Sequence, residues 1–150
     1  VQVSAGEVIS FRTFMSGELF ALMSEYSVLK HSVNSDGWNN QEFNSAVSES
    51  ISNPQKLLSD FFKLRADDLL NKVEKSVLRS KLSGYIIGTE LAGAKPYWLG
   101  QNIVILAKDD LSKVYKAALK GQGVFAQEVD ATKCTLDGLT KAFSLIDGRY

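Results

Sequence analysis

The sequence predicts an α/β fold with three parts: an N-terminal hairpin, a helical middle and a C-terminal strand–helix–strand–helix (βαβα) unit. Three observations support this. The 150 residues suit one domain, since a domain takes roughly 100–200 residues. Strand-forming residues gather at the N-terminus and near positions 102–107 and 124–129, and apolar residues at helical spacing fill the rest. No repeat, low-complexity tract or linker divides the chain, so we expect a single domain.

The composition excludes several classes of function. With 17 basic and 17 acidic residues the net charge is zero, so nothing draws the chain to nucleic acid or an anionic membrane. No apolar run reaches the roughly 18 residues of a spanning helix. One cysteine permits no internal disulfide, which suits a cytoplasmic protein. The chain begins at Val1 and reads at once as strand, which we interpret as a piece of something longer.

The first 29 residues predict a hairpin that leads directly into a helix. Residues 2–16 favour strand, with a turn at Ala5-Gly6. Ser16 is a suitable N-cap for a helix over residues 17–29, and Glu18 in its first turn interacts favourably with the helix dipole.

The middle predicts three helices. Residues 30–40 are polar and read as a loop that ends in a cap at Asn39 or Asn40. A short helix then stops before Pro54, which begins the next helix at its first turn. A long helix follows over residues 73–94. Its interior glycines, Gly84, Gly88 and Gly93, each cost about 1 kcal/mol relative to alanine, which indicates close packing or a nearby ligand.

The last third predicts the βαβα unit. Residues 102–107 form an unbroken apolar run, typical of a strand covered on both faces. A helix over 110–120 ends at Gly121, a suitable C-cap, and a strand over 124–129 precedes a helix over 135–146. The two strands should be parallel, because a helix connects them.

Common catalytic motifs are absent. The sequence has no phosphate-binding G-x-x-x-x-G-K-[ST] loop, dinucleotide-binding G-x-G-x-x-G, G-x-S-x-G elbow or H-E-x-x-H pair. His31 has no second histidine to complete a usual metal site, and we interpret it as a surface residue. Cys134 lies near a helix start, where a thiol pKa can fall, but a half-buried apolar role fits better.

Four features carry possible chemistry, and each has a structural alternative. Residues 12–18 place an arginine, hydroxyls and a carboxylate at a strand–helix junction, which can hold an anion or simply be a capped turn with a salt bridge. The Gly84-x-x-x-Gly88-x-Glu90 face offers room for a flat ring or for a second helix. Residues 108–110 follow the buried strand, where α/β folds bind ligands, but Asp109 can equally be an N-cap. Tyr97-Trp98 forms either a ring platform or an anchor to the core.

In order along the chain, three segments resemble one family. Residues 10–19 (SFRTFMSGEL) with 27–29 (SVL) are similar to the F-R-T-x-M-T-G-E-L…H-S-[IL]-L run of the bacterial 2-dehydro-3-deoxygalactonokinases. Residues 61–66 (FFKLRA) resemble that family's L-F-x-[VL]-R-A, and residues 82–92 (LSGYIIGTELA) resemble its L-S-G-x-L-I-G-x-E-[VL]-A. The resemblance covers nearly the whole chain.

The resemblance implies the C-terminal lobe, over residues 1–150, of a two-lobed sugar-acid kinase with the actin-like ATPase (RNase H-like) architecture. It implies transfer of the γ-phosphoryl of ATP to the 6-hydroxyl of 2-dehydro-3-deoxy-D-galactonate in galactonate breakdown, with Mg²⁺ as the metal. The family's D-x-G-[ST]-T-N-x-[KR] and P-G-T-H-x-K-W phosphate turns are absent here. Since phosphoryl transfer depends on positioning and on neutralising charge, we expect the isolated chain to be inactive or nearly so.

The implied partners are ATP, a small sugar acid and the protein's own N-terminal lobe. The sequence leaves open whether the protein forms a homodimer, because an exposed apolar stripe cannot be distinguished from core residues in the sequence alone.

The resemblance also assigns roles to residues. Arg12 would pair with the sugar carboxylate, because a guanidinium matches a carboxylate through two hydrogen bonds. Thr13 and Ser16 would contact the sugar, and Glu18 would bind a sugar hydroxyl or hold Arg12. Gly88 and Glu90 would border the nucleotide, as would Lys108 and Asp109. The catalytic base is not identified, and no metal ligand is assigned.

One departure favours a second hypothesis. Where the family commonly has G-T or G-S after the buried strand, this chain has Lys108-Asp109-Asp110. Two carboxylates beside a polyphosphate are unfavourable unless a cation offsets them. The alternative is therefore a non-catalytic association or ligand-sensing domain that has kept the fold.

Overall fold

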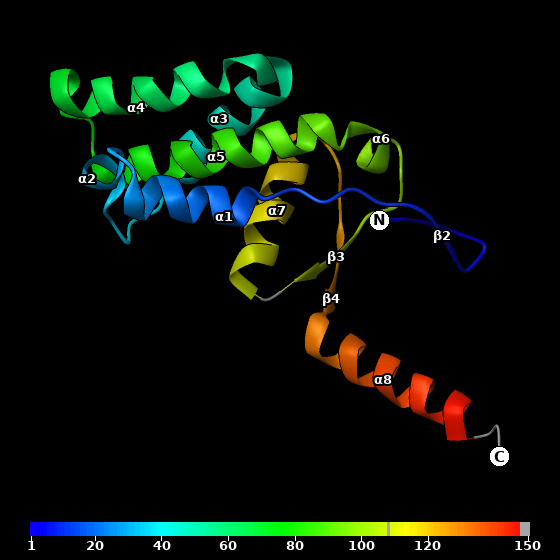
Figure 1. Cartoon of the computed structure of the whole chain (residues 1–150). Helices are drawn as coiled ribbons and strands as arrows, with labels where there is room; N and C mark the ends of the chain where they lie inside the picture. The colour runs from blue at the N-terminus through cyan, green and yellow to red at the C-terminus, as the bar shows by residue number, and fades with distance from the viewer. Residues whose placement is uncertain (108, 148–150) are drawn as a thin grey trace. The chain divides into compact units, whose positions relative to one another are not determined.

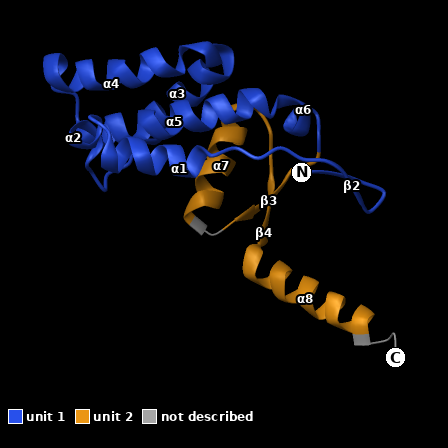
Figure 2. Cartoon of the chain, viewed as in Figure 1, with its two compact units in different colours: residues 1–101 blue, residues 102–150 orange. Residues whose placement is uncertain are grey.

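The computed structural model describes residues 1–107 and 109–147 (Figure 1). It divides the chain into two units, residues 1–101 and residues 102–150 (Figure 2). The first unit holds the hairpin and most of the helices, and the second holds the βαβα unit, which confirms the predicted α/β class. The boundary between the units was not predicted, because it falls beside a single left-handed glycine, Gly100 (φ 71°), and not in a linker.

The hairpin forms where the sequence predicts it. Strands β1 (Gln2–Ser4) and β2 (Glu7–Ser10) are antiparallel and are joined by Ala5 (φ 51°) and Gly6 (φ 82°). Two left-handed residues in a two-residue turn match the twist of the flanking strands. The predicted strand character beyond Ser10 is wrong, because residues 11–15 pair with no other strand in the described part of the chain.

The first helix begins one residue earlier than predicted. Helix α1 (Ser16–Ala21) continues as a π-helical turn, η1 (Leu22–Tyr26). The N-cap position belongs to Met15, whose carbonyl accepts from the Leu19 N–H at 2.8 Å. The interpretation of Ser16 as a capping side chain is therefore wrong.

The polar segment after this helix is not all loop. It contains the short helix α2 (Lys30–Val33), which buries Val33 completely. Burial of this one apolar side chain stabilises a turn that the surrounding polar residues did not suggest.

The predicted break between the middle helices is confirmed. Helix α3 (Asn40–Ser52) is capped by Asn39, whose Oδ1 accepts from the Glu42 N–H at 3.1 Å. Pro54 then begins the 3₁₀ turn η2 (Pro54–Lys56), which leads into α4 (Leu57–Asn71). The long helix α5 (Lys75–Gly93) and the short α6 (Lys95–Trp98) complete the first unit.

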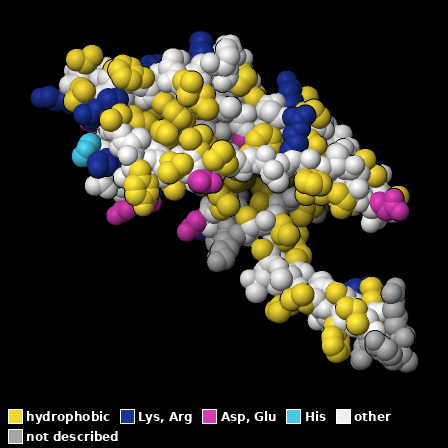
Figure 3. All heavy atoms as spheres, in the orientation of Figure 1, with side chains coloured by type: hydrophobic (Ala, Val, Ile, Leu, Met, Phe, Trp, Pro, Cys, Tyr) yellow, Lys and Arg dark blue, Asp and Glu magenta, His cyan; other side chains and the backbone are white. Residues whose placement is uncertain are grey.

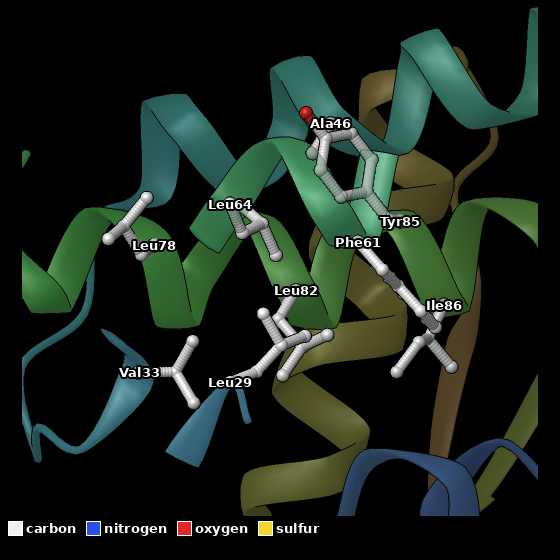
Figure 4. Close-up of a cluster of buried hydrophobic side chains, with 9 residues drawn as sticks. All are labelled: Leu29, Val33, Ala46, Phe61, Leu64, Leu78, Leu82, Tyr85 and Ile86. Carbon is white, nitrogen blue, oxygen red and sulfur yellow. The ribbon is translucent and has the colours of Figure 1, made fainter. Parts of the chain in front are cut away.

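The core of the first unit lies where α4 and α5 pack together with α2 and α3. Figure 4 shows the side chains of this cluster, which come from all of these helices and from the residue before α2: Leu29, Val33, Ala46, Phe61, Leu64, Leu78, Leu82, Tyr85 and Ile86. All nine are at most 7% exposed. Burial in this cluster raises the pKa of the Tyr85 phenol well above its usual range, so it stays neutral.

The second unit has the predicted βαβα order. Strands β3 (Val104–Ala107) and β4 (Gln127–Asp130) are parallel and are connected by α7 (Asp109–Gly121), and α8 (Ala131–Asp147) follows. The last helix begins four residues before the predicted Thr135. Among the described residues, no helix is long and apolar enough to cross a membrane.

Two details of this unit correct the sequence interpretation. The left-handed residue after α7 is Gly123 (φ 76°) and not Gly121, because the Val124 N–H returns to the Leu119 carbonyl at 3.0 Å and closes a Schellman turn. Strand β3 is not covered on both faces in this chain, since Val104 and Leu106 are each 57% exposed.

Candidate functional site

One cavity of the first unit lies where three segments of the chain meet. It has a volume of about 490 Å³, within the range of small-molecule sites. The segments are the start of α1, the η2–α4 junction and the last two turns of α5. Its lining is mostly apolar: Phe14, Met15, Ser16, Leu19, Pro54, Leu57, Ile86, Thr89, Glu90, Ala92 and Gly93.

Two side chains attach the segment before α1 to the end of α5. Arg12 Nη1 donates to the Gly93 carbonyl at 2.7 Å, and its guanidinium lies 6.0 Å from the centre of the Tyr97 ring. A cation at the carboxyl end of a helix also interacts favourably with the helix dipole. The Phe14 ring packs against Gly93, where a methyl group would lie 3.2 Å from a ring carbon. Gly93 therefore accommodates this close contact.

These contacts change the interpretation of the strand–helix junction. The capped turn with a salt bridge is wrong, because Arg12 binds a backbone carbonyl and Ser16 makes no capping bond. No ion pair joins Arg12 to Glu18 within residues 1–107 and 109–147, so Glu18 does not hold the guanidinium. Since a guanidinium has five N–H donors and one faces Gly93, others remain for a ligand.

The structure brings together two residues that the resemblance assigns to different ligands. Ser16, assigned to the sugar, and Glu90, assigned to the nucleotide, line the same cavity. Thr13 and Glu18 are exposed and lie outside its lining. Arg12 is also outside the lining, but it is bonded to Gly93, which belongs to it.

Gly88 does not border an open space. A methyl group there would lie 2.6 Å from the Val47 carbonyl oxygen and 2.8 Å from the Ser50 Cβ. At Gly84 it would meet the Phe43 carbonyl at 2.6 Å. Helix α3 therefore fills the small-residue face of α5, and the helix-packing alternative is confirmed. Gly88 is therefore covered by α3 within this chain, and its place beside a nucleotide stays a prediction.

The Tyr97-Trp98 pair acts mainly as an anchor. Trp98 is 5% exposed and its indole N–H donates to the Leu91 carbonyl at 2.8 Å, which attaches α6 to α5. Tyr97 is half-buried beside the Arg12 guanidinium. The anchoring alternative is thus confirmed for Trp98.

The remaining assigned residues lie in or near the second unit. Lys108 is outside the described residues, as is the side chain of Asp109, whose backbone begins α7. Asp110 is fully exposed, 3.4 Å from Lys113 in the next turn.

The single histidine and cysteine lie as the sequence suggests. His31 is exposed on α2, and Cys134 is half-buried on α8. Across residues 1–107 and 109–147, no group of three or more acidic, histidine or cysteine side chains could hold a metal ion. These residues therefore do not fit Mg²⁺ by themselves.

The sequence gives no functional signal for three residues of the cavity. Pro54 and Leu57 line it only because the start of α4 lies beside the end of α5. Thr89 stands between the two residues assigned to a nucleotide, and its hydroxyl donates to the Tyr85 carbonyl at 2.8 Å. Proline and leucine have no polar group by which a binding site could be recognised in a sequence.

The chemistry that this arrangement offers is binding. The apolar walls suit the carbon skeleton or ring of a ligand, Ser16 and Glu90 supply a hydroxyl and a carboxylate, and Arg12 supplies a cation beside the lining residue Gly93. A small organic anion would find its charge partner in Arg12 and its orientation in the two polar lining groups.

Comparison with known proteins agrees with the three motif segments. A family model described as 2-keto-3-deoxy-galactonokinase matches residues 1–142. The protein named "Probable 2-dehydro-3-deoxygalactonokinase DgoK1" of Rhizobium meliloti (strain 1021) is 32% identical over 146 residues, which are 95% of this chain and 48% of that protein. The "2-dehydro-3-deoxygalactonokinase" of Escherichia coli (strain K12) is 27% identical over 124 residues, 82% of this chain and 42% of that protein.

A solved structure shows the same fold. The chain superimposes with a TM-score of 0.88 and 33% identity on the "Crystal structure of a putative 2-dehydro-3-deoxygalactonokinase protein from Sinorhizobium meliloti". The match covers 96% of this chain and 48% of that one. The chain thus spans about half the length of the relatives it matches.

Proposed function

Since the chain belongs to the 2-keto-3-deoxy-galactonokinase family, we propose that it is the C-terminal lobe of a sugar-acid kinase with the actin-like ATPase architecture. The complete enzyme transfers the γ-phosphoryl of ATP to the 6-hydroxyl of 2-dehydro-3-deoxy-D-galactonate. Support comes from the family match over residues 1–142 and from relatives about twice as long. A second lobe would then supply the phosphate turns, and the chain alone has little or no activity.

The observation that carries the proposal is the position of Arg12 beside the cavity. The bond to the Gly93 carbonyl at 2.7 Å and the neighbouring Tyr97 ring orient the guanidinium. A guanidinium held by one N–H presents its other donors as a fork, which pairs with the carboxylate of a sugar acid. Ser16 then contacts a sugar hydroxyl, and Thr13 and Glu18 contribute from the exposed side of the same turn.

The nucleotide side of the proposal rests on Glu90, Lys108 and Asp109. ATP supplies the phosphoryl group and Mg²⁺ offsets its charge when both are bound. Because the described residues do not fit a metal ion, the metal ligands and the catalytic base belong to the second lobe in this proposal. The role of this chain is to bind and orient the acceptor.

The test is an assay of the full-length protein for ATP-dependent phosphorylation of 2-dehydro-3-deoxygalactonate. Absence of turnover with this and other sugar acids would refute the kinase, whereas turnover with another sugar acid only would refute the substrate alone. The same assay is then run on the isolated chain. A turnover rate comparable to that of an ordinary sugar kinase would refute the requirement for a second lobe.

The role of Arg12 has its own test. Arg12→Lys keeps the charge but loses the fork, so we expect the KM for the sugar acid to rise about tenfold to a hundredfold, as for a lost charge-assisted bond of about 1.5–3 kcal/mol. The KM for ATP should not change. Arg79→Lys is the matched control, because the Arg79 guanidinium also lies over an aromatic ring, 5.1 Å from the centre of Phe20, away from the cavity lining. If both variants changed the KM for the sugar acid equally, the proposed role of Arg12 in binding the sugar acid would be refuted.

One observation favours a second candidate function. Lys108-Asp109-Asp110 stands where an uncharged turn would suit a polyphosphate, and Asp110 is fully exposed. A non-catalytic association or ligand-sensing domain would tolerate these charges. Titration calorimetry of the full-length protein with ATP and Mg²⁺ separates the two functions, since this candidate requires no heat of nucleotide binding.

A further inference from the structure

Helix α4 has two apolar faces, and only one of them packs in the core. On the inner face, Phe61 and Leu64 are 7% and 1% exposed. On the outer face, the large apolar side chains stay 61–80% exposed: Leu58, Phe62, Leu69 and Leu70. A surface helix normally carries polar residues opposite its core face, so this second apolar face needs a different explanation.

The outer face is continuous and uncharged. At 100° per residue, an arc of about 120° on α4 contains only Leu58, Ser59, Phe62, Ala66, Leu69 and Leu70. We call this set the outer α4 arc. Charged residues border the arc on both sides: Lys63, which is exposed, and Arg65, whose guanidinium is bonded to Asp68 and to the Ser32 hydroxyl, each at 3.2 Å.

A neighbouring loop extends the arc. Val28, which is 67% exposed, lines a hollow of about 180 Å³ together with Leu58, Phe62 and Arg65. Figure 3 shows hydrophobic side chains gathered over this part of the first unit, around α4. The apolar surface therefore includes the outer α4 arc and the residue Val28 beside it.

We propose that the outer α4 arc is a homodimer interface, on which the same helix of a second copy packs in the antiparallel direction. The residue order supports this partner. In an antiparallel pair whose two-fold axis passes near residue 64, Phe62 lies at the same height along the pair as Ala66 of the second copy, Leu69 at the height of Ser59, and Leu58 at the height of Leu70. Each level of the pair thus holds one large and one small residue or two leucines, so the arc can pack on a copy of itself.

The exposed area is of the right size for this contact. Five large apolar side chains exposed by 61–80% amount to an apolar patch on the order of 600 Å². A standard interface takes about 800 Å² from each partner, and the flanking polar residues supply the remainder. The lack of charge in the arc also fits a copy of itself, since two identical charged faces would repel each other.

The first experiment compares two equally exposed phenylalanines. Phe62 is 73% exposed in the arc, and Phe143 is 68% exposed on α8. Sedimentation velocity should show a dimer of the protein, and Phe62→Asp should raise its dissociation constant at least tenfold, while Phe143→Asp changes it less than twofold. A monomeric protein would overturn the proposal. So would a dimer that responds to Phe143→Asp and not to Phe62→Asp. A monomer in which only Phe62→Asp lowers the melting temperature would overturn it as well, by showing that the protein's own chain covers the arc.

The second experiment tests the antiparallel order and does not depend on dimer strength. In a Cys134→Ser background, Ser59→Cys protein is mixed with Leu69→Cys protein under mild oxidation. We expect a disulfide-linked dimer in the mixture and not in either variant alone, since like thiols lie about 15 Å apart along the helix, beyond the reach of a disulfide. Cross-linking of each variant with itself would overturn the antiparallel arrangement, and a dimer without any cross-link would place the interface elsewhere.

Discussion

Helices α5 and α8 are both long and both contain glycine, but many residues of α5 are buried whereas the large apolar side chains of α8 are exposed. Helix α5 buries eleven of its residues, and its glycines at 84 and 88 admit the backbone of α3 within van der Waals contact. Along α8, Leu136, Leu139 and Phe143 are exposed by 60–68%, and a methyl group at Gly138 would meet nothing within 4 Å. The first unit therefore has a packed core of its own, whereas the apolar residues of α8 contribute little to the stability of this chain.

The largest effect is expected when one leucine in each helix is replaced by alanine. Leu82 on α5 is fully buried, so Leu82→Ala should lower the free energy of unfolding by about 3–4 kcal/mol through lost burial and a cavity. Leu139→Ala on α8 should change it by less than about 0.5 kcal/mol, because that side chain is 63% exposed. Urea unfolding followed by circular dichroism measures both. A loss of similar size at Leu139 would show that α8 has a core contact.

The next largest effect is expected at the glycines of the same two helices, where an alanine should lower the stability in α5 and raise it in α8. Gly88→Ala should destabilise by about 2–3 kcal/mol, because its methyl group would lie 2.6 Å from a backbone oxygen that cannot rotate away. Gly138→Ala should stabilise α8 by about 0.5–1 kcal/mol, since alanine has the higher helix propensity and the space is open. Thermal unfolding of the two variants measures both changes in stability. A Gly88→Ala variant more stable than the unchanged protein would contradict the close contact of α3 with α5.

The smallest expected effect on stability concerns a buried carboxylate of the first unit. Asp60 on α4 is 6% exposed and one of its carboxylate oxygens has no hydrogen-bond partner. Burial, followed by the nearby Glu49 carboxylate, raises the pKa of Asp60 above its usual range. A raised pKa in the folded state means that the contribution of Asp60 to stability is present at low pH and is lost as the pH rises through that pKa.

Asp60→Asn should therefore stabilise the protein at pH 7, because it removes a carboxylate whose charged form is disfavoured by burial and by the nearby Glu49. The gain should shrink as the pH falls toward the range in which Asp60 is protonated. Melting temperatures of both proteins between neutral and acidic pH provide the measurement. A gain that is independent of pH would mean that the change acts through packing and not through the charge of Asp60.

Much of the local structure could be predicted because local signals specify it. The Ala5-Gly6 turn, the Asn39 cap and the helix start at Pro54 each depend on residues within four positions of one another. The errors lie where a distant contact decides the outcome. Val33, for example, turns a polar segment into a helix by its burial. The end of α7 is an exception: Gly123 replaces Gly121 through a local hydrogen bond from the Val124 N–H to the Leu119 carbonyl.

For the candidate site, too, the sequence indicated individual residues but not how they are arranged in space. The sequence singled out Arg12, Ser16 and Glu90 as groups with chemistry, and the family motifs singled them out again. It did not indicate that Ser16 and Glu90 line one cavity with Pro54, nor that Gly88 is covered by α3. A motif records which residue types are present, but not which surface another helix will cover.

By itself, then, the sequence determined the α/β class, the order of most elements and the family, because turn chemistry, helical periodicity and motif order are all properties of neighbouring residues. Only the tertiary structure decided that Arg12 bonds to the Gly93 carbonyl, 81 positions away, and that α4 keeps a second apolar face exposed. Both outcomes depend on the path by which the chain brings distant segments together, and the free energy of those contacts is not recorded in any local pattern.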